Sequence, residues 1–307
     1  MSIPPNTKFL STIANSSGLP VYRLNFTDKQ VPRRIVQAFA RECLTHIIFG
    51  EIDSEQMRQV AKAARVRLWT GGEQSDNDLD IFQAQSIYRH VVSQYNIDNF
   101  GRLLAETNEM SREYNDGSSI LEISEKHKLS PYAIFKQVVK CDRKKLNYLA
   151  VGKIRATDVF TSQHDIEQYE IAQKYDFSSV AAQLKLAQDA QRREDNFVRI
   201  LRQIGINFKT QRELFEEAMQ QQTHPITPDV LLLSNVSING VLVKWIDFKA
   251  YFGATIPFIT SSLRKQYKKY AITFGHGIFA FEHGVVADLP NSVSVRALRD
   301  IIDEGTR

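Results

Sequence analysis

Two apolar runs flanking a tight-turn dipeptide dominate the carboxyl-terminal third of this 307-residue chain. Residues 230–238 and 241–248 are rich in Val, Leu, Ile and Phe. Asn239-Gly240 between them tolerates the positive φ angles of a hairpin turn, so the pattern predicts a β-hairpin. Its polar positions gather at the end away from the turn, at Asp229, Asp247 and Lys249.

The alternation of side chains along a strand makes a specific demand on this turn. A two-residue turn leaves Asp229 on the face opposite to Asp247. A three-residue loop, with Gly240 left-handed in a bulge, pairs Asp229 with Lys249. We therefore expect the bulged loop, because it places all three polar side chains on one face.

Helical spacing of apolar residues predicts a mostly helical chain before the hairpin. Gly, Ser and acidic residues at 71–78 indicate an exposed linker. We expect a strand at 21–24, helices within 31–67 and at 80–94, 99–113, 178–204 and 211–222, and a short strand at 206–209. After the hairpin we expect a helix at 260–273, a strand at 278–281 and an amphipathic helix at 293–303.

Residues 120–127 and 131–139 show a helix-turn-helix pattern, with Ser119 and Ser130 available as helix caps. From 121 to 155 there are nine Lys or Arg and three Asp or Glu, a local charge of 9 − 3 = +6. Such a patch suits phosphate contacts, with the second helix offered to a DNA groove. The candidate contacts are Lys136, Lys140, Arg143, Lys144 and Lys145. The alternative is an ordinary helix pair with a solvated, Lys-rich face.

Composition places the chain among globular proteins, with 43% apolar and 24% charged residues. The net charge of +4 leans mildly towards a polyanionic partner. Cys43 and Cys141 are too few for a disulfide framework, so we expect a reducing compartment. Because no signal peptide or long apolar run is visible, we expect an intracellular, soluble protein without a membrane role, nuclear or cytoplasmic if eukaryotic.

The three polar residues of the hairpin permit a specific chemistry. Clustered carboxylates bind Mg²⁺ through oxygen ligands, and a nearby lysine can orient water or neutralise a scissile phosphate. Glu194 on the preceding helix and Gln266 on the following one complete the candidate set. Basic residues that cover one face of that following helix fit a polyanionic substrate: Arg264, Lys265, Lys268 and Lys269. The alternatives are an ion pair that closes the sheet end and a solvated surface helix.

Acid-x-Lys alone is a weak signal, and Asp142-Arg143-Lys144 repeats it at a charged helix end without an upstream Pro-Asp strand. The longer motifs are more specific. They are Thr-Pro-Asp at 227–229, Val-Lys-Trp-Ile-Asp-Phe-Lys-Ala at 243–250, Arg-Lys-Gln-Tyr at 264–267 and Phe-Gly-His-Gly at 274–277. Over residues 115–287 the chain resembles the codanin-interacting nuclease family, or Thr-Pro-Asp-motif proteins, a branch of the PD-(D/E)xK superfamily close to Holliday-junction resolvases.

The resemblance implies an α/β fold with a restriction-endonuclease-like αβββαβ core, preceded by helical and helix-turn-helix regions. It implies that Glu194, Asp229 and Asp247 hold Mg²⁺, for which Mn²⁺ can substitute, and that Lys249 and Gln266 complete the catalytic set. Asp247 stands where relatives commonly carry Glu, which shifts the carboxylate by about one bond length. The family is associated with codanin, histone supply and the nucleus, so a codanin-like partner is expected.

We expect three parts: a mostly helical region at 1–110, a helix-turn-helix region at 111–177 and the nuclease-like domain at 178–307. The expected function is metal-dependent hydrolysis of DNA phosphodiester bonds, with a structure-specific substrate. The alternative is a catalytically silent DNA-binding or scaffold protein that acts through a protein partner. RNA is the less favoured substrate, and a resolvase-like core is compatible with a homodimer.

Overall fold

The chain folds into two compact units whose segments alternate along the sequence. The computed structural model describes residues 10–14, 20–26, 30–69, 71, 75, 77–140 and 142–298. The first unit draws on residues 1–37, 66–87 and 190–307, and the second on residues 38–65 and 88–189. These boundaries do not coincide with the ones expected at 110 and 177. Together the units give a mixed α/β protein, as expected.

A mixed sheet forms the centre of the first unit, with seven strands in the described part of the chain. Its order is β1 (Leu10–Ala14), β2 (Pro20–Leu24), β6 (Val230–Ile238), β7 (Val241–Lys249), β8 (Ile278–Phe281) and β9 (Ser292–Ser294), and β5 (Phe208–Thr210) also pairs with β6. Strands β2 and β6 are parallel, as are β7, β8 and β9, whereas β6 and β7 form the antiparallel hairpin. The expected strands at 21–24, 206–209 and 278–281 are thus present with small shifts of their ends.

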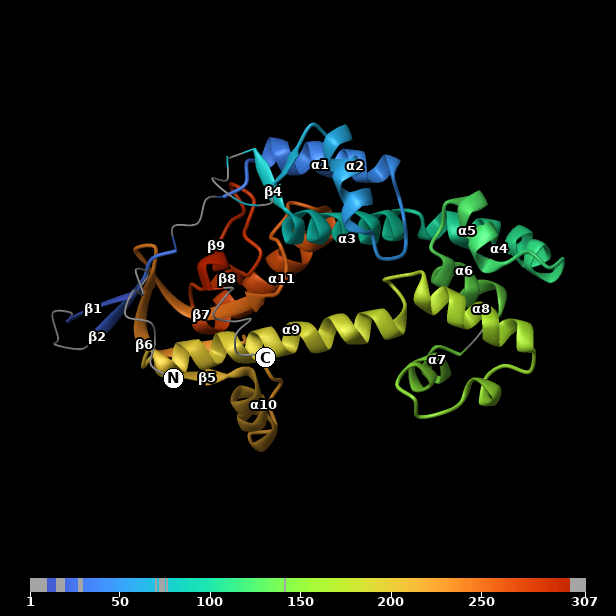
Figure 1. Cartoon of the computed structure of the whole chain (residues 1–307). Helices are drawn as coiled ribbons and strands as arrows, with labels where there is room; N and C mark the ends of the chain where they lie inside the picture. The colour runs from blue at the N-terminus through green and yellow to red at the C-terminus, as the bar shows by residue number, and fades with distance from the viewer. Residues whose placement is uncertain are drawn as a thin grey trace. The chain divides into compact units, whose positions relative to one another are not determined.

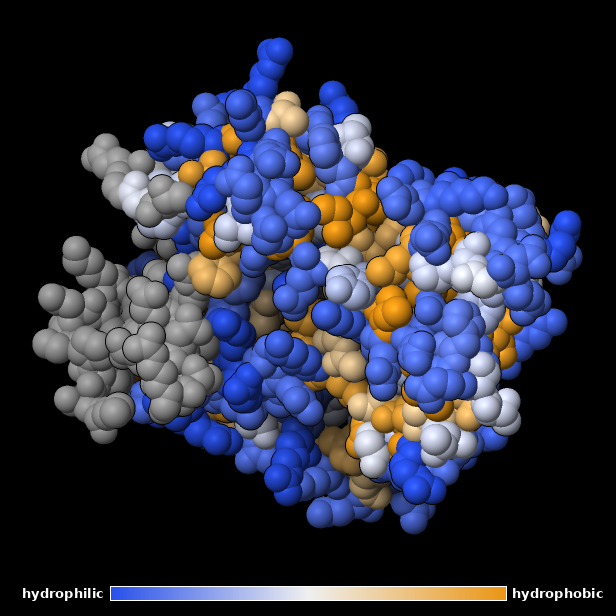
Figure 2. Space-filling view, turned by 45° about the vertical axis from the view of Figure 1, so that its right-hand side comes forward, coloured by the Kyte–Doolittle hydropathy of each residue, from blue (hydrophilic) through white to orange (hydrophobic). Residues whose placement is uncertain are grey.

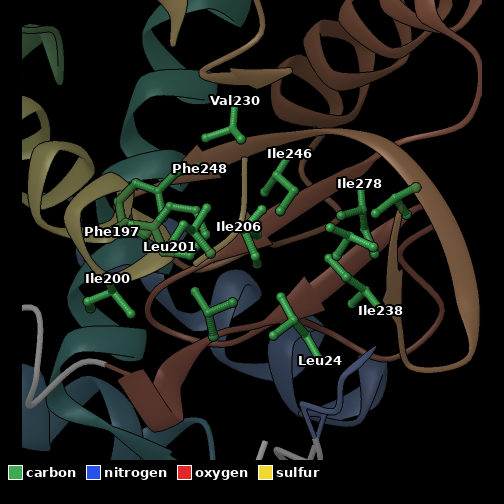
Figure 3. Packing of buried hydrophobic residues seen from close by; sticks show 14 of the residues in the cluster. Leu24, Phe197, Ile200, Leu201, Ile206, Val230, Ile238, Ile246, Phe248 and Ile278 are labelled. Atoms are coloured by element: carbon green, nitrogen blue, oxygen red, sulfur yellow. The ribbon is translucent and has the colours of Figure 1, made fainter. Parts of the chain in front are cut away.

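Helices α9 (Val180–Gln203) and α11 (Pro257–Phe274) pack on opposite faces of this sheet (Figure 1). Phe197 of α9 stacks on Phe248 of β7 with ring centroids 4.9 Å apart, inside the buried cluster that Figure 3 shows. On the other face Trp245 meets Tyr270 of α11 edge to face at 5.1 Å. Strand β7 is therefore covered on both sides, which explains its nearly continuous apolar sequence.

Trp245 is held by the turn that follows α11. Its indole nitrogen donates a 3.0 Å hydrogen bond to the carbonyl of Gly275, whose φ of +89° ends the helix. At Gly277 a Cβ atom would lie 2.1 Å from the Trp245 ring, so only glycine fits. This close approach explains the Phe-Gly-His-Gly motif.

The first unit also contains β3 (Arg67–Trp69) and β4 (Asp78–Asp80), which pair in parallel. Arg67 forms an ion pair with the buried Asp78, and this hydrogen bond lowers the pKa of Asp78 to about 2. Asp78 therefore does not belong to an exposed linker, contrary to expectation. Residues 72–74 and 76 of that linker lie outside the described residues.

Helices account for nearly all of the second unit, and α1 and α3 reach into it from the first. Their bounds are α1 (Arg33–Thr45), α2 (Ser54–Ala63), α3 (Ile81–Asp98), α4 (Phe100–Asn115), α5 (Ile120–His127), α6 (Pro131–Val138), α7 (Arg143–Ala150) and α8 (Gln163–Lys174). The expected caps are confirmed: the side chains of Ser119 and Ser130 accept the N–H groups of Glu122 and Ala133. Lys128, at φ +50°, ends α5 and opens the short turn to α6.

The carboxyl-terminal helix expected at 293–303 is wrong where it can be seen, since β9 and a 3₁₀ turn, Arg296–Leu298, occupy that stretch. Val293 and Val295 are buried in the sheet core, and pairing with β8 outweighs the helical spacing. Residues 299–303 lie outside the described residues.

Among the described helices, none has both the length and the apolar character needed to cross a bilayer. Figure 2 shows one face of the molecule, where hydrophilic side chains are interrupted by smaller apolar patches.

Candidate active site

The hairpin turn contains two residues, not the expected three. Ile238 pairs with Val241, and Asn239 and Gly240 have φ angles of +48° and +84°. These values are typical of a type I′ turn. The side chain of Asn239 bonds the backbone N–H and carbonyl of Phe26 at 2.7 and 3.0 Å, which fixes the tight turn against the chain that follows β2. The predicted bulge at Gly240 is therefore wrong.

An irregularity farther along the hairpin still brings Asp229, Asp247 and Lys249 to one face of the sheet. Between the pairs Leu231–Trp245 and Val236–Val243, β6 has four residues where β7 has only Lys244. The carbonyl of Asn207 accepts the N–H groups of the extra residues at 233 and 234, at 2.9 and 3.0 Å. Here β6 also exchanges its other neighbour, β5, for β2. The extra residues shift the register by an odd number of positions, which turns the side chains to the other face.

As a result Asp229 lies across from Asp247 instead of Lys249. Val230 pairs with Ile246, and the same register continued by one residue brings the two acids opposite each other. Residues that face each other across two strands share a face, as do residues two apart along one strand. Asp229, Asp247 and Lys249 therefore share a face, as predicted, although for a different reason.

Asp247 is the centre of the group and is only 1% exposed. One carboxylate oxygen forms an ion pair with the ammonium of Lys249, and the other accepts a 2.8 Å hydrogen bond from Gln266 Nε2 of α11. Gln266 also contacts the hydroxyl of Tyr270 at 3.1 Å, and that hydroxyl donates to the carbonyl of Thr227. Tyr270 was not predicted from the sequence, although its position four residues after Gln266 places it on the same helix face.

Asp229 is held beside Asp247 by the backbone. Its Oδ2 accepts a 2.7 Å hydrogen bond from the N–H of Phe248. Burial raises the pKa of Asp229 to about 8, and the like charges of Asp247 and Glu194 add to this effect. A buried carboxyl repelled by two other acids is destabilising unless a proton or a cation compensates it.

Glu194 reaches the same group from α9, and its side chain is half-buried. Burial raises its pKa, and the charge of Asp247 is the next cause. The carboxyl of Glu194 is thus close enough to Asp247 to interact with its charge, although α9 and α11 cover opposite faces of the sheet. The neighbouring Arg193 forms a 2.6 Å ion pair with the fully buried Glu282, just after β8. This buried pair, which the sequence did not predict, fixes α9 near the site.

Lys249 has a side chain that is 17% exposed. Burial disfavours its charge, but the carboxylate of Asp247 outweighs this and the pKa of Lys249 is raised. Its ammonium also lies 5.8 Å from the ring centroid of Phe279 on β8. Lys249 is therefore a firmly charged cation at the edge of the acidic group.

The three acids carry the kind of oxygen ligands that a divalent cation prefers, but their ligand atoms are not grouped tightly around one point. Hard carboxylate oxygens and mutual repulsion favour Mg²⁺. Among the described residues, the group with ligand atoms within 4.8 Å of one another is Glu109, Glu113 and His127, not the three acids of the hairpin site. In that other group the ammonium of Lys126 already bonds both glutamates. It is a surface ion-pair network between α4 and α5.

The basic residues of the two candidate surfaces differ in exposure. On α11, Arg264, Lys265, Lys268 and Lys269 are all exposed. On α6, however, every residue is at least half-buried, and Lys136 Nζ lies 4.8 Å from the ring centroid of Tyr132. Because of this burial, α6 has little exposed surface with which to contact a DNA groove.

Beyond α6, Lys140, Lys144 and Lys145 are exposed, whereas the side chain of Arg143 lies outside the described ones. Asp142, in the second acid-x-Lys sequence, caps α7 by accepting the N–H groups of Lys144 and Lys145. That acid has a structural role, as its setting predicted.

The three acids, Lys249 and the basic residues of α11 all lie within residues 161–301. Residues 161–301 match a family model. Its description is "Protein of unknown function TPD sequence-motif", and the segment contains Thr227-Pro228-Asp229. The match supports the resemblance to the Thr-Pro-Asp-motif family.

A stretch of 99 residues is 38% identical to an uncharacterized protein of Acanthamoeba polyphaga mimivirus. It covers 30% of this chain and 34% of that relative. The chain thus spans about a third of the length of the relative that it matches. No solved structure matches the chain.

Proposed function

We propose that this protein is a metal-dependent nuclease that hydrolyses DNA phosphodiester bonds. One observation carries the proposal: the register shift of the hairpin gathers Asp229 and Asp247 beside Lys249, and Glu194 interacts with both acids. Such an arrangement costs stability, because buried like charges repel each other. Binding and turnover of a charged substrate explain why a chain would bear that cost.

The order of elements supports the same proposal. Helix α9, strands β5, β6 and β7, helix α11 and strand β8 follow each other as α, βββ, α and β, with α10 (Gln211–Gln220) inserted after β5. We propose that they form a restriction-endonuclease-like core. In it Glu194, Asp229 and Asp247 would hold Mg²⁺.

The residues have distinct tasks in the proposed reaction. Hydrolysis forms a bond between a water oxygen and phosphorus, breaks the bond to the leaving oxygen and returns a proton to that oxygen. Bound Mg²⁺ would supply positive charge against the negative charge that builds on the phosphate oxygens. Lys249 would neutralise a phosphate oxygen, and Gln266 would hold the carboxylate of Asp247 in one orientation. The loss of one such electrostatic contact costs about 3 kcal/mol of transition-state stabilisation, roughly a hundredfold in rate.

The test compares matched acid-to-amide variants on a panel of linear, flap, four-way and single-stranded DNAs with Mg²⁺ or Mn²⁺. Asp247→Asn and Glu194→Gln should each lower cleavage at least about a hundredfold. Asp195→Asn changes an exposed acid next to Glu194 and should cleave like the wild type. Equal cleavage by wild type and Asp247→Asn would show that the activity does not come from this site.

A second candidate function is a DNA-binding or scaffold protein with a silent site. Two observations favour it. The three acids are not among the groups whose metal-ligand atoms all lie within 4.8 Å of one another, and Lys249 already pairs with Asp247. No cleavage of any substrate together with salt-sensitive DNA binding would favour this alternative. An RNA arm on the same panel tests the less favoured substrate.

A further inference from the structure

A cavity of about 410 Å³ opens beside the candidate active site, within the first unit. It lies against α11 and the turn at 288–291, with Phe279 of β8 in its wall. A ligand-sized pocket usually encloses roughly 300 to 1,000 Å³, so this one suits a group as large as a single nucleotide.

Two arginines on the wall, Arg33 and Arg264, have guanidinium groups without a partner among the described residues. Arg33, at the start of α1, and Arg264, on α11, are exposed. Neither makes a hydrogen bond or an ion pair with any other residue that the structure describes. Asp288 also lines the cavity, so its charged side chains sum to 2 − 1 = +1. Arginine pairs recognise phosphate through paired N–H donors, and a carboxylate accepts N–H groups from the edge of a base.

The same wall carries a fixed aromatic ring. The hydroxyl of Tyr267 bonds Nδ1 of His276 at 2.8 Å, and its ring packs against Trp245 at 5.6 Å. Tyr267 is still half-exposed, so part of it remains open to the cavity. Unstacked nucleic-acid bases bind to aromatic side chains of this kind.

Phe279 links the cavity to the acidic group. It lines the cavity, and its ring centroid lies 5.8 Å from the ammonium of Lys249. Gln266, which bonds Asp247, and Tyr267, which faces the cavity, are neighbours on α11. A strand whose phosphate reaches Lys249 would therefore have its next nucleotide within reach of the cavity.

We propose that this cavity binds one unstacked nucleotide of the DNA strand that is cut. The phosphate of the nucleotide bonds Arg33 and Arg264, its base lies against Tyr267, and Asp288 accepts base N–H groups. This inference rests on the proposed nuclease function and adds the substrate class: DNA with an unpaired or displaced nucleotide next to the scissile bond. An anion site alone would not need the aromatic wall.

The test measures binding of dGMP, deoxyguanosine and inorganic phosphate to the full chain in EDTA by ligand-observed NMR. We expect dGMP to bind more tightly than either of its parts. Arg33→Gln/Arg264→Gln should raise the dissociation constant for dGMP at least about tenfold, because each guanidinium supplies a charge-assisted hydrogen bond. Lys185→Gln, an exposed change on α9 outside the cavity lining, should leave it unchanged.

Three results would overturn the proposal: no binding of dGMP, equal affinity for dGMP and inorganic phosphate, or equal affinity in the wild type and the double variant. Both arginines are exposed, so circular dichroism should show that the double variant folds. Binding in EDTA is independent of cleavage. Cleavage without dGMP binding would refute the nucleotide-binding cavity but leave the proposed nuclease function standing. Binding of dGMP without cleavage of any DNA would refute the nuclease function but leave the nucleotide-binding cavity standing.

Discussion

The N–H of Phe248 donates a 2.7 Å hydrogen bond to Oδ2 of Asp229. This contact joins the residue just before β6 to the end of β7 and keeps the Asp229 carboxyl next to Asp247. The Asp229 carboxyl is therefore held in a buried position beside other carboxyl groups. Its protonation should control the stability of the metal-free protein.

The first prediction concerns pH. Burial raises the pKa of Asp229 from 3.8 to about 8 in the folded protein. Between these values the folded state binds more protons than the unfolded state, so metal-free stability should fall as the pH rises from about 4 to 8. The slope is at most about 1.4 kcal/mol per pH unit for one proton. Asp229→Asn, which keeps an acceptor for Phe248, should flatten this slope in denaturant unfolding with EDTA.

The exposed Asp195→Asn variant is the control and should keep the wild-type slope. Added Mg²⁺ should stabilise the wild type more than Asp229→Asn at pH 8, since a cation replaces the proton. Identical slopes in the wild type and Asp229→Asn would contradict the buried position of this carboxyl.

The second prediction concerns the orientation of Asp247. Gln266→Leu removes the donor to Asp247 Oδ2 and should lower kcat/KM for DNA cleavage about tenfold, the worth of one hydrogen bond to a charged group. Ile272→Ala changes a residue of the same helix that is 77% exposed and should have no effect. If both variants cleave like the wild type, Gln266 does not position the acid.

The third prediction concerns the turn after α11. Gly277→Ala places a Cβ atom 2.1 Å from the Trp245 ring, so the indole must move. Overpacking of this kind costs about 1 to 3 kcal/mol, visible as a lower Tm. Gly101→Ala is the control, because its Cβ meets nothing within 4 Å. In helix α4 that change should stabilise by about 0.5 to 1 kcal/mol, and equal losses in both variants would refute the packing argument.

The fourth prediction separates the two basic surfaces. Lys265→Gln/Lys268→Gln on α11 should reduce the dependence of log Kd on log salt concentration by about 0.9 for each lost phosphate contact. Lys144→Gln/Lys145→Gln on α7 tests the helix-turn-helix region in the same way. All four lysines are exposed, so the folds should be kept. The pair that leaves the slope unchanged does not contact DNA.

Much of the local structure could be predicted from the sequence. Ser119, Ser130 and Pro131 marked the helix starts of the helix-turn-helix, because capping is a local interaction. The tight turn at Asn239-Gly240 was misjudged. Its length depends on Phe26, more than 200 positions away, whose backbone bonds the Asn239 side chain.

The sequence predicted which residues of the hairpin share a face, but not the strand register that places them there. Alternation along the strands indicated that Asp229, Asp247 and Lys249 share a face. The partner of Asp229 depends on Asn207, which stabilises the extra residues of β6, and no local pattern announces that contact. The helix predicted after Val293 was wrong because of a similar distant contact. This segment pairs with strand β8 instead of forming a helix.

The way in which β6 changes neighbours has a consequence for biosynthesis. Strand β2 pairs Val21 with Asn235, so the amino-terminal hairpin must wait for a partner that the ribosome makes more than 200 residues later. The second unit, by contrast, is complete once residue 189 has been made. Contacts close in sequence form faster than distant ones, and domains fold as units during synthesis. The helical unit should therefore fold first, and the acidic group assembles only when the last strands emerge.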